Sequence, residues 1–274
     1  MSRNVIGPMP SRSSWQLVGP VALWGKMPGH GDFIRRNLPF EQEEALEEWV
    51  GRKRGILSPL EEVQRKVTND IPRNSLESRT SRPVSGYPGQ PWCFVLPPRS
   101  LPFTADRYLI GVWMDSSDKV GRKYPVIMIQ TAARRWVEPY FAFHAERPRE
   151  WLFHAARLIA HSIRAQRDEA GRLSGARAET DRIAVFQARL NALWSLYAPD
   201  WRNFLGKRIS FPGKEARQIR NLIEPPPPDD PVRHLDGVRF LPWADWPDCL
   251  LNSTAQGFFW QQNLHGRFIG AIRA

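Results

Sequence analysis

The residues best suited to chemistry lie in one short glycine-rich stretch, Gly25–Phe33, which directly follows the apolar run Val21–Trp24. Glycines and a proline shape the backbone there, because glycine reaches φ values that other residues avoid and proline fixes φ. Between them stand a cation, an imidazole and a carboxylate, namely Lys26, His30 and Asp32. The pattern predicts a strand that runs into a shaped loop, which presents these side chains in a defined arrangement.

A lysine in a glycine-rich loop also suggests phosphate binding. The nucleotide-binding pattern is glycine, four residues, then Gly-Lys and a hydroxyl residue. Here five residues separate Gly19 from Gly25, and Met27 occupies the position of the metal-binding hydroxyl. The stretch therefore departs from the nucleotide-binding pattern. Two interpretations stay open, a structural transition from strand to loop and a partner-binding loop.

A second polar stretch, Asp115–Lys123, lies between two apolar segments, Tyr108–Met114 and Tyr124–Gln130. Both segments are rich in β-branched and aromatic residues, which is typical of strands. The polar piece between them contains one glycine and suits a hairpin loop. Such a short connection predicts that the two strands pair antiparallel.

Together the two stretches resemble the TagF family, also called ImpM, of bacterial type VI secretion accessory proteins. The first family pattern is an aromatic residue, Gly-Lys-x-Pro-x-x-Gly-Asp-Phe, arginines and Leu-Pro, and it appears here at residues 24–39. The second is Asp-x-Val-Gly-Arg-x-aromatic-Pro after serines, and it appears at residues 118–125 with Tyr124 in place of phenylalanine. The resemblance covers residues 18–145 well and the rest more loosely, where Gly257–Gln262 is similar to an aromatic segment of longer members.

The resemblance implies a regulator and not an enzyme. Members of this family act after translation to restrain assembly or firing of the secretion apparatus, and the implied partner is Fha, a scaffold protein with a forkhead-associated domain. No cofactor or metal is implied, and the chain shows no phosphatase segment of the kind fused to some members. The alternative is a small phosphorylated-ligand-binding protein or hydrolase that uses the loop Gly25–Asp32.

The charged and polar motif residues are the candidate partner-binding residues: Lys26, His30, Asp32, Arg35, Arg36, Arg122 and Lys123. Other motif residues are predicted to shape the strands and loops: Trp24, Gly25, Pro28, Gly31, Phe33, Asp118, Gly121, Tyr124 and Pro125. In the competing interpretation, the motif residues of both kinds merely build the sheet. Ion pairs of Asp32 or Asp118 with Arg35 or Arg122 would hold the two loops in register.

No complete catalytic or metal-binding set accompanies the motifs. His154 and His161 are seven residues apart, beyond the i, i+4 spacing with which two helical histidines share a zinc ion. The sequence lacks a Gly-x-Ser-x-Gly elbow, and Cys93 and Cys249 lie in no motif typical of an activated thiolate. We therefore expect no catalytic or metal site and interpret the histidines as core or surface residues.

The composition combines a sizeable potential core with a strong positive charge. Among 274 residues, 39 are Lys or Arg and 28 are Asp or Glu, which gives a formal net charge of +11. The cations are scattered without a nucleic-acid-binding motif, so an acidic protein surface or plain solvation is favoured over nucleic acid. No apolar run approaches the roughly 20 residues that span a bilayer, and residues 1–14 lack a signal peptide's apolar core. We expect a cytoplasmic protein without membrane insertion.

We predict an α/β fold in which a mixed, largely antiparallel sheet is flanked by helices, with a helical C-terminal half. Three parts are expected: residues 1–17 as a disordered tail, 18–145 as a TagF-type α/β domain, and 146–274 as a helical segment, a proline-rich linker and C-terminal strands on the same core.

Apolar spacing and punctuation by proline and glycine predict the individual elements. Strands are expected at Gly19–Trp24 and Trp92–Leu96, and two short strands near the C-terminus should return to the sheet or cover its edge. Two helices separated near Gly55 and Pro59 are expected within Phe40–Val67, with further helices after Pro148 and over residues 183–197. Thr68–Gln90 should form a long surface loop.

Overall fold

The computed structural model describes residues 17–57, 89–142, 151–169, 176–197, 248–251, 256–263 and 268–274. Within these ranges the chain forms a seven-stranded sheet in the order β2-β1-β5-β4-β3-β6-β7, with antiparallel pairing throughout. The strands are β1 Ala22–Gly25, β2 Ile34–Arg36, β3 Trp92–Leu96, β4 Tyr108–Met114, β5 Val126–Ala132, β6 Phe258–Gln262 and β7 Phe268–Arg273. The predicted α/β fold with helices flanking a largely antiparallel sheet is confirmed, but the expected mixture of parallel and antiparallel pairs is not found among the described strands.

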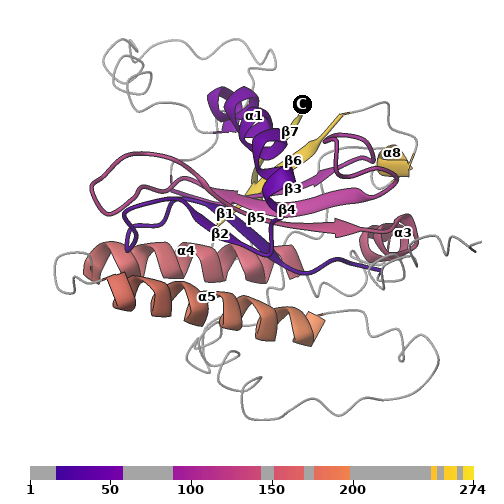
Figure 1. The fold of residues 1–274 in the computed structure, drawn as a ribbon. Coiled ribbons are helices and arrows are strands. Elements are labelled where there is room, and N and C mark those ends of the chain that lie inside the picture. Colours follow the sequence, from indigo (N-terminus) through magenta and orange to yellow (C-terminus); the bar gives the residue numbers. More distant parts are fainter. Residues whose placement is uncertain are drawn as a thin grey trace, which may run out of the picture.

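Helices cover both faces of this sheet (Figure 1). Helix α1, Phe40–Leu57, lies on one face, whereas α4, Trp151–Glu169, and α5, Ala176–Tyr197, lie side by side on the other. The shorter helices are α3, Arg134–Ala142, which follows β5, and α8, Asp248–Leu251, which precedes β6. None of the described helices combines the length and the apolar character that crossing a bilayer requires.

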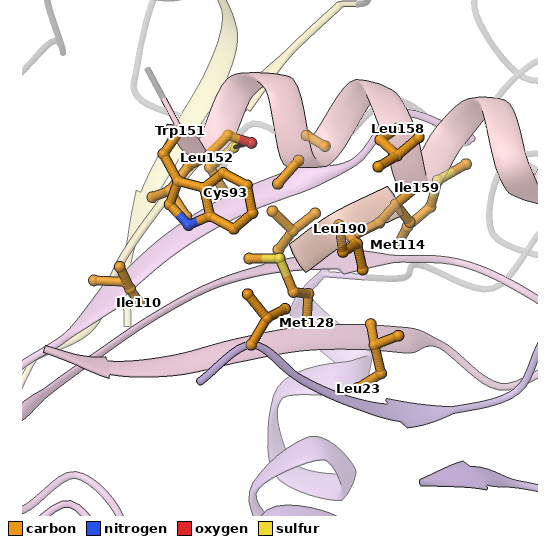
Figure 2. Close-up of a cluster of buried hydrophobic side chains, with 14 of the residues drawn as sticks. Leu23, Cys93, Ile110, Met114, Met128, Trp151, Leu152, Leu158, Ile159 and Leu190 are labelled. Atoms are coloured by element: carbon orange, nitrogen blue, oxygen red, sulfur yellow. Dashed lines mark hydrogen bonds between the residues drawn. The ribbon is translucent and has the colours of Figure 1, made fainter. Parts of the chain in front are cut away.

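Two hydrophobic cores result, because successive strand residues point to opposite faces of a sheet. Leu23, Met128 and Leu152 belong to the cluster between the sheet and α4, which Figure 2 shows. Strand residues that alternate with this set point to the other face and pack against α1. There Trp113 of β4 meets Trp49 of α1 edge to face, with ring centroids 5.9 Å apart. The sheet is therefore buried on both sides around its centre.

The helices on the α4 face follow the predicted apolar spacing. The stripe expected after Pro148 is at most 1% exposed, and it comprises Leu152, Ala155, Ala156, Ile159 and Ile163. The second stripe contributes Phe186, Leu190 and Leu193 to the same core. Both stripes are therefore core, as their spacing indicated.

Not every expected boundary was correct. Helix α1 continues through Gly51 and Gly55, each at a cost of only about 1 kcal/mol, and buried Leu57 is its last residue. This end lies between Gly55 and Pro59, where a separation was expected, and the second helix expected there lies outside the described residues. Strand β5 begins two residues later than predicted, because Tyr124 and Pro125 belong to the hairpin connection. Strand β2 and helix α3 were not anticipated, since three residues are too few for an alternating pattern and Pro139 within α3 is a residue that disfavours helix interiors.

The expectation of a helical C-terminal half was also wrong. Helices α4 and α5 are followed in the described residues by β6 and β7, which extend the sheet beside β3. The two C-terminal strands thus return to the sheet, as their aromatic composition suggested. The N-terminal tail through residue 16, the proline-rich linker and residues 68–88 of the expected surface loop lie outside the described residues. The division into three parts stays a prediction.

Candidate functional site

The two sequence motifs meet at one end of the sheet (Figure 1). The loop after β1 lies beside the β4–β5 hairpin loop because β1 and β5 are neighbouring strands. Two backbone hydrogen bonds join the loops: the Lys26 N–H donates to the Pro125 carbonyl at 3.2 Å, and the Lys119 N–H donates to the His30 carbonyl at 2.8 Å. We call this contact between the two motif loops the motif junction.

The buried carboxylate of Asp118 stands at the centre of the motif junction. Its Oδ2 accepts hydrogen bonds from Lys26 Nζ at 2.8 Å and from Arg122 Nε at 2.5 Å. Its Oδ1 accepts the backbone N–H groups of Val120 and Arg122 at 3.1 and 2.8 Å. The Asp118 side chain has no exposed surface, and that of Lys26 is 9% exposed. One carboxylate thus shapes its own loop and binds it to the other.

This environment holds the pKa of Asp118 well below its ordinary value. Burial alone would raise that pKa, but hydrogen bonds from Lys26 and from the backbone and side chain of Arg122 outweigh the effect of burial. Asp118 is therefore ionised at neutral pH. Such a carboxylate is a fixed hydrogen-bond acceptor, whereas a general acid or base needs a pKa near the working pH.

Arg122 links the loops a second time while it stays accessible. Its Nη2 donates to the Gly31 carbonyl at 2.8 Å, and its side chain is 61% exposed. Of the predicted ion pairs, the one between Asp118 and Arg122 exists, but the prediction that an arginine pairs with a carboxylate between the two loops was wrong. Asp118 pairs with Arg122 inside its own loop, but the charge that pairs with Asp118 across the junction is Lys26.

The other predicted ion-pair partners lie outside this network. Arg35 pairs with Glu43 of α1 at 3.0 Å. Asp32 is exposed and forms no ion pair within the part of the chain that the structure describes.

Three aromatic rings of the motifs pack together beside the ion pair. Trp24, Phe33 and Tyr124 have ring centroids between 4.9 and 5.5 Å apart. Lys26 Nζ lies 5.2 Å from the Phe33 ring centroid, and the Arg54 guanidinium lies 5.3 Å from that of Tyr124. Burial raises the pKa of Tyr124 to about 12, with a further increase from Glu47 and an opposing effect from Arg54. Motif residues thus form a compact cluster.

Two of the motif glycines are required by backbone geometry. Gly25 has φ 120°, and a Cβ at this position would stand 2.0 Å from the Pro125 carbonyl oxygen. Gly121 has φ 90° in the hairpin loop. Gly31, in contrast, has open space around the position of a Cβ. The structural interpretation therefore accounts for Gly25 and Gly121 but gives no steric reason for Gly31.

The seven candidate partner-binding residues divide by burial. Lys26 and His30 are buried, with whole-residue exposures of 7% and 4%, and they lie beneath the surface of the loops. Arg36 is half-buried, and the remaining candidates are exposed: Asp32, Arg35, Arg122 and Lys123. A partner that approaches this end of the sheet would contact the exposed residues and little of Lys26 or His30.

Residues outside the motifs complete the junction, and no local pattern marks them. Gln166 of α4 accepts a hydrogen bond from the Gly29 N–H at 3.2 Å. Arg54 of α1 donates to the Lys123 carbonyl at 2.9 Å. Their partners are 137 and 69 positions away in the sequence, so only the folded chain reveals them. Helices on opposite faces of the sheet thus hold the two loops.

The described residues contain no group of three or more His, Cys, Asp or Glu side chains placed to hold a metal ion. Lys26 Nζ is engaged by Asp118, which limits the charge it presents to a phosphate group.

The fold and the motif junction define an α/β protein whose two signature loops are joined by a buried ion pair. The TagF N-terminal domain family, described as type VI secretion system-associated, matches residues 22–175, which include both motifs. This match covers more than half of the chain, and the chain belongs to this family. The resemblance inferred from the motifs is confirmed.

A solved structure is also similar, the crystal structure of PA0076 from Pseudomonas aeruginosa PAO1. The two sequences are 19% identical over 57% of this chain and 63% of that chain, with a TM-score of 0.32. The similarity thus spans less than two thirds of that protein's length. No curated protein matches this chain.

Proposed function

We propose that this protein is a non-catalytic negative regulator of a bacterial type VI secretion system. It acts after translation, in the cytoplasm, and restrains assembly or firing of the apparatus by binding a forkhead-associated (Fha) scaffold protein. Membership of the TagF N-terminal domain family supports the link to the secretion system. The direction of regulation and the scaffold partner are what the family resemblance implies.

The observation that favours a binding role is the firmly held, exposed surface over the motif junction. Arg35, Arg122 and Lys123 are exposed, while the Lys26–Asp118 ion pair holds the loops beneath them. A surface that is already ordered loses little conformational entropy when a partner binds. Binding alone would be enough to restrain the apparatus. Scaffold molecules that are held on this surface, that is, sequestered, cannot join the assembly of the apparatus at the membrane.

The test is a pull-down of the Fha scaffold by the full chain, together with a secretion assay in cells. Replacing Arg35, Arg36 and Lys123 together with Glu should abolish scaffold binding and raise secretion, while the melting temperature stays within a few degrees. Arg189→Glu on the exposed part of α5 is the control, because it reverses a surface charge on the opposite face of the sheet.

Two results would contradict the proposal in different ways. Undiminished scaffold binding by the triple variant would reject this surface, and failure of the wild-type chain to retain the scaffold would reject sequestration. A thermal shift with nucleotides and divalent metals tests the alternative of a phosphorylated ligand, since a ligand that binds the native state raises the melting temperature.

A further inference from the structure

We infer that the hairpin loop and the end of α1 form a docking site for a short acidic segment of a partner protein; this rests on the proposed function, since it specifies the chemistry that the regulator's partner presents. The site is defined by four basic residues from two separate elements, which we call the cationic rim: Arg54, Lys119, Arg122 and Lys123.

The arginines of the cationic rim are held in position by the fold. Arg122 donates to Asp118 and to the Gly31 carbonyl, yet its side chain is 61% exposed. Arg54 donates to the Lys123 carbonyl and stacks on the Tyr124 ring. A guanidinium fixed in this way loses less side-chain entropy when it binds a carboxylate than a freely rotating one.

The charged residues of the hairpin loop segment 119–123 are all positive. The loop residues 119–123 comprise three cations, a valine and a glycine, without any acid. The nearest loop carboxylate, Asp118, is buried and already shared between Lys26 and Arg122. The outward-facing charge of residues 119–123 is therefore positive, and it complements aspartate and glutamate side chains.

An apolar contact lies within the charged surface. Val120 is 73% exposed between the cations of the loop. Phe33 is 41% exposed and packs on Tyr124, whose ring also contacts Arg54. Burial of an apolar side chain beside charge-assisted hydrogen bonds gives affinity that charge alone does not supply in water. The complementary segment therefore carries an apolar residue among its acids.

Acidic residues lie next to the cationic rim. Because they would repel a long polyanion, the surface fits a short acidic protein segment better. Glu47 of α1 lies close enough to Tyr124 to raise its pKa, and Glu43 lies beside Arg35. Asp32 is exposed next to Phe33. A nucleic-acid backbone needs a continuous basic path, which these carboxylates interrupt. A few acidic residues of a peptide can contact the rim without reaching them.

The test measures fluorescence anisotropy of the full chain with a fluorescein-labelled peptide of aspartate and glutamate around one leucine. The double variant Lys119→Glu, Lys123→Glu should weaken binding by at least about tenfold, because attraction becomes repulsion. Arg189→Glu should leave the affinity within about twofold, since the change of one charge on the far face is screened by salt. Val120→Ser should weaken binding of the leucine peptide but not of its serine counterpart.

Equal loss in the double variant and in Arg189→Glu would overturn the docking site in favour of a general charge effect. Tighter binding of a single-stranded oligonucleotide than of the peptide would overturn it in favour of nucleic acid, and absence of peptide binding would also reject it. A pull-down of the Fha scaffold separates the two proposals. If the double variant retains the scaffold, the docking site fails while the proposed function stands. If the wild-type chain binds the peptide but no scaffold, the proposed function fails.

Discussion

At the scale of single residues, Asp118 has the largest set of structural roles in the motif junction. It accepts four hydrogen bonds, two of them from cations, and has no exposed side-chain surface. Breaking a buried pair by removing one partner leaves the other charge without compensation, which costs more than the pair itself contributes. The ion pair therefore makes the geometry of both loops depend on one carboxylate.

Asp118→Asn should lower the melting temperature at pH 7 by several degrees, because Lys26 would stay buried without a counter-charge. It should also make the melting temperature fall less steeply as the pH is lowered into the acidic range. The pKa of Asp118 is depressed in the folded state, so its contribution is complete above the unfolded pKa of about 3.9 and is lost as the pH falls below that value. Thermal melts between neutral and acidic pH measure both effects.

The matched control is Asp32→Asn, which changes an exposed carboxylate of the same motif. It should leave the melting temperature at pH 7 unchanged. An Asp118→Asn variant as stable as the wild type at pH 7 would show that the ion pair does not hold the loops.

Gly25→Ala should destabilise the protein by more than about 1 kcal/mol in urea unfolding, because alanine at a positive φ is strained. The new Cβ would also stand 2.0 Å from the Pro125 carbonyl oxygen and force β1 away from the hairpin. Gly31→Ala tests the contrast, since open space surrounds that position, and it should change stability by less than about 0.5 kcal/mol. Equal effects of the two substitutions would refute this account of Gly25.

At the scale of elements, helices α1 and α4 hold the two loops from opposite faces of the sheet. Gln166 reaches the first loop from α4, and Arg54 reaches the second from α1. Strand β2 has only three residues, two of them arginines, at the edge of the sheet. Short, charged edge strands resist pairing with other chains, so binding at this end depends on side chains and not on added strands.

Gln166→Ala should loosen the loop after β1 without unfolding the protein. The Gly29 N–H would lose its acceptor, at a cost of about 1 kcal/mol, and its amide hydrogen should exchange several-fold faster. Arg167→Ala, which changes an exposed neighbour on the same helix, should leave that exchange rate unchanged. Unaltered exchange of Gly29 in Gln166→Ala would show that α4 does not restrain the loop.

Local patterns predict the elements better than the junction between them. Strands β3 and β4 have the expected bounds because each is an apolar run interrupted by proline or by charge. The burial of Lys26 could not be predicted, because its partner Asp118 is 92 positions away and the sequence does not reveal which charges meet.

At the scale of the whole molecule, the region that matches the family does not complete the sheet. Strands β6 and β7 lie beyond residue 175, yet β6 pairs with β3 and buries Phe258, Phe259 and Trp260 in the two cores. The C-terminal strands therefore contribute to the stability of the motif-bearing part. Without β6, the edge of β3 would also expose a strand made entirely of apolar residues, which favours aggregation.

Trp260→Ala should cost about 3–5 kcal/mol in urea unfolding of the full chain, because it removes a large side chain that is 1% exposed. Phe268→Ala, in the adjacent strand, removes a side chain that is 42% exposed and should cost less than about 1 kcal/mol. A loss below about 1 kcal/mol for Trp260→Ala would show that the C-terminal strands are not part of the common core.

The Lys26–Asp118 pair also favours the native register of strand β1 against β5. A slip of β1 by one residue against β5 would turn every side chain of β1 to the opposite face. Lys26 would then be carried away from Asp118, and two charges with little access to water would each lack a partner. Misaligned pairings of β1 are thus penalised at a point just beyond the strand, before any partner protein is present.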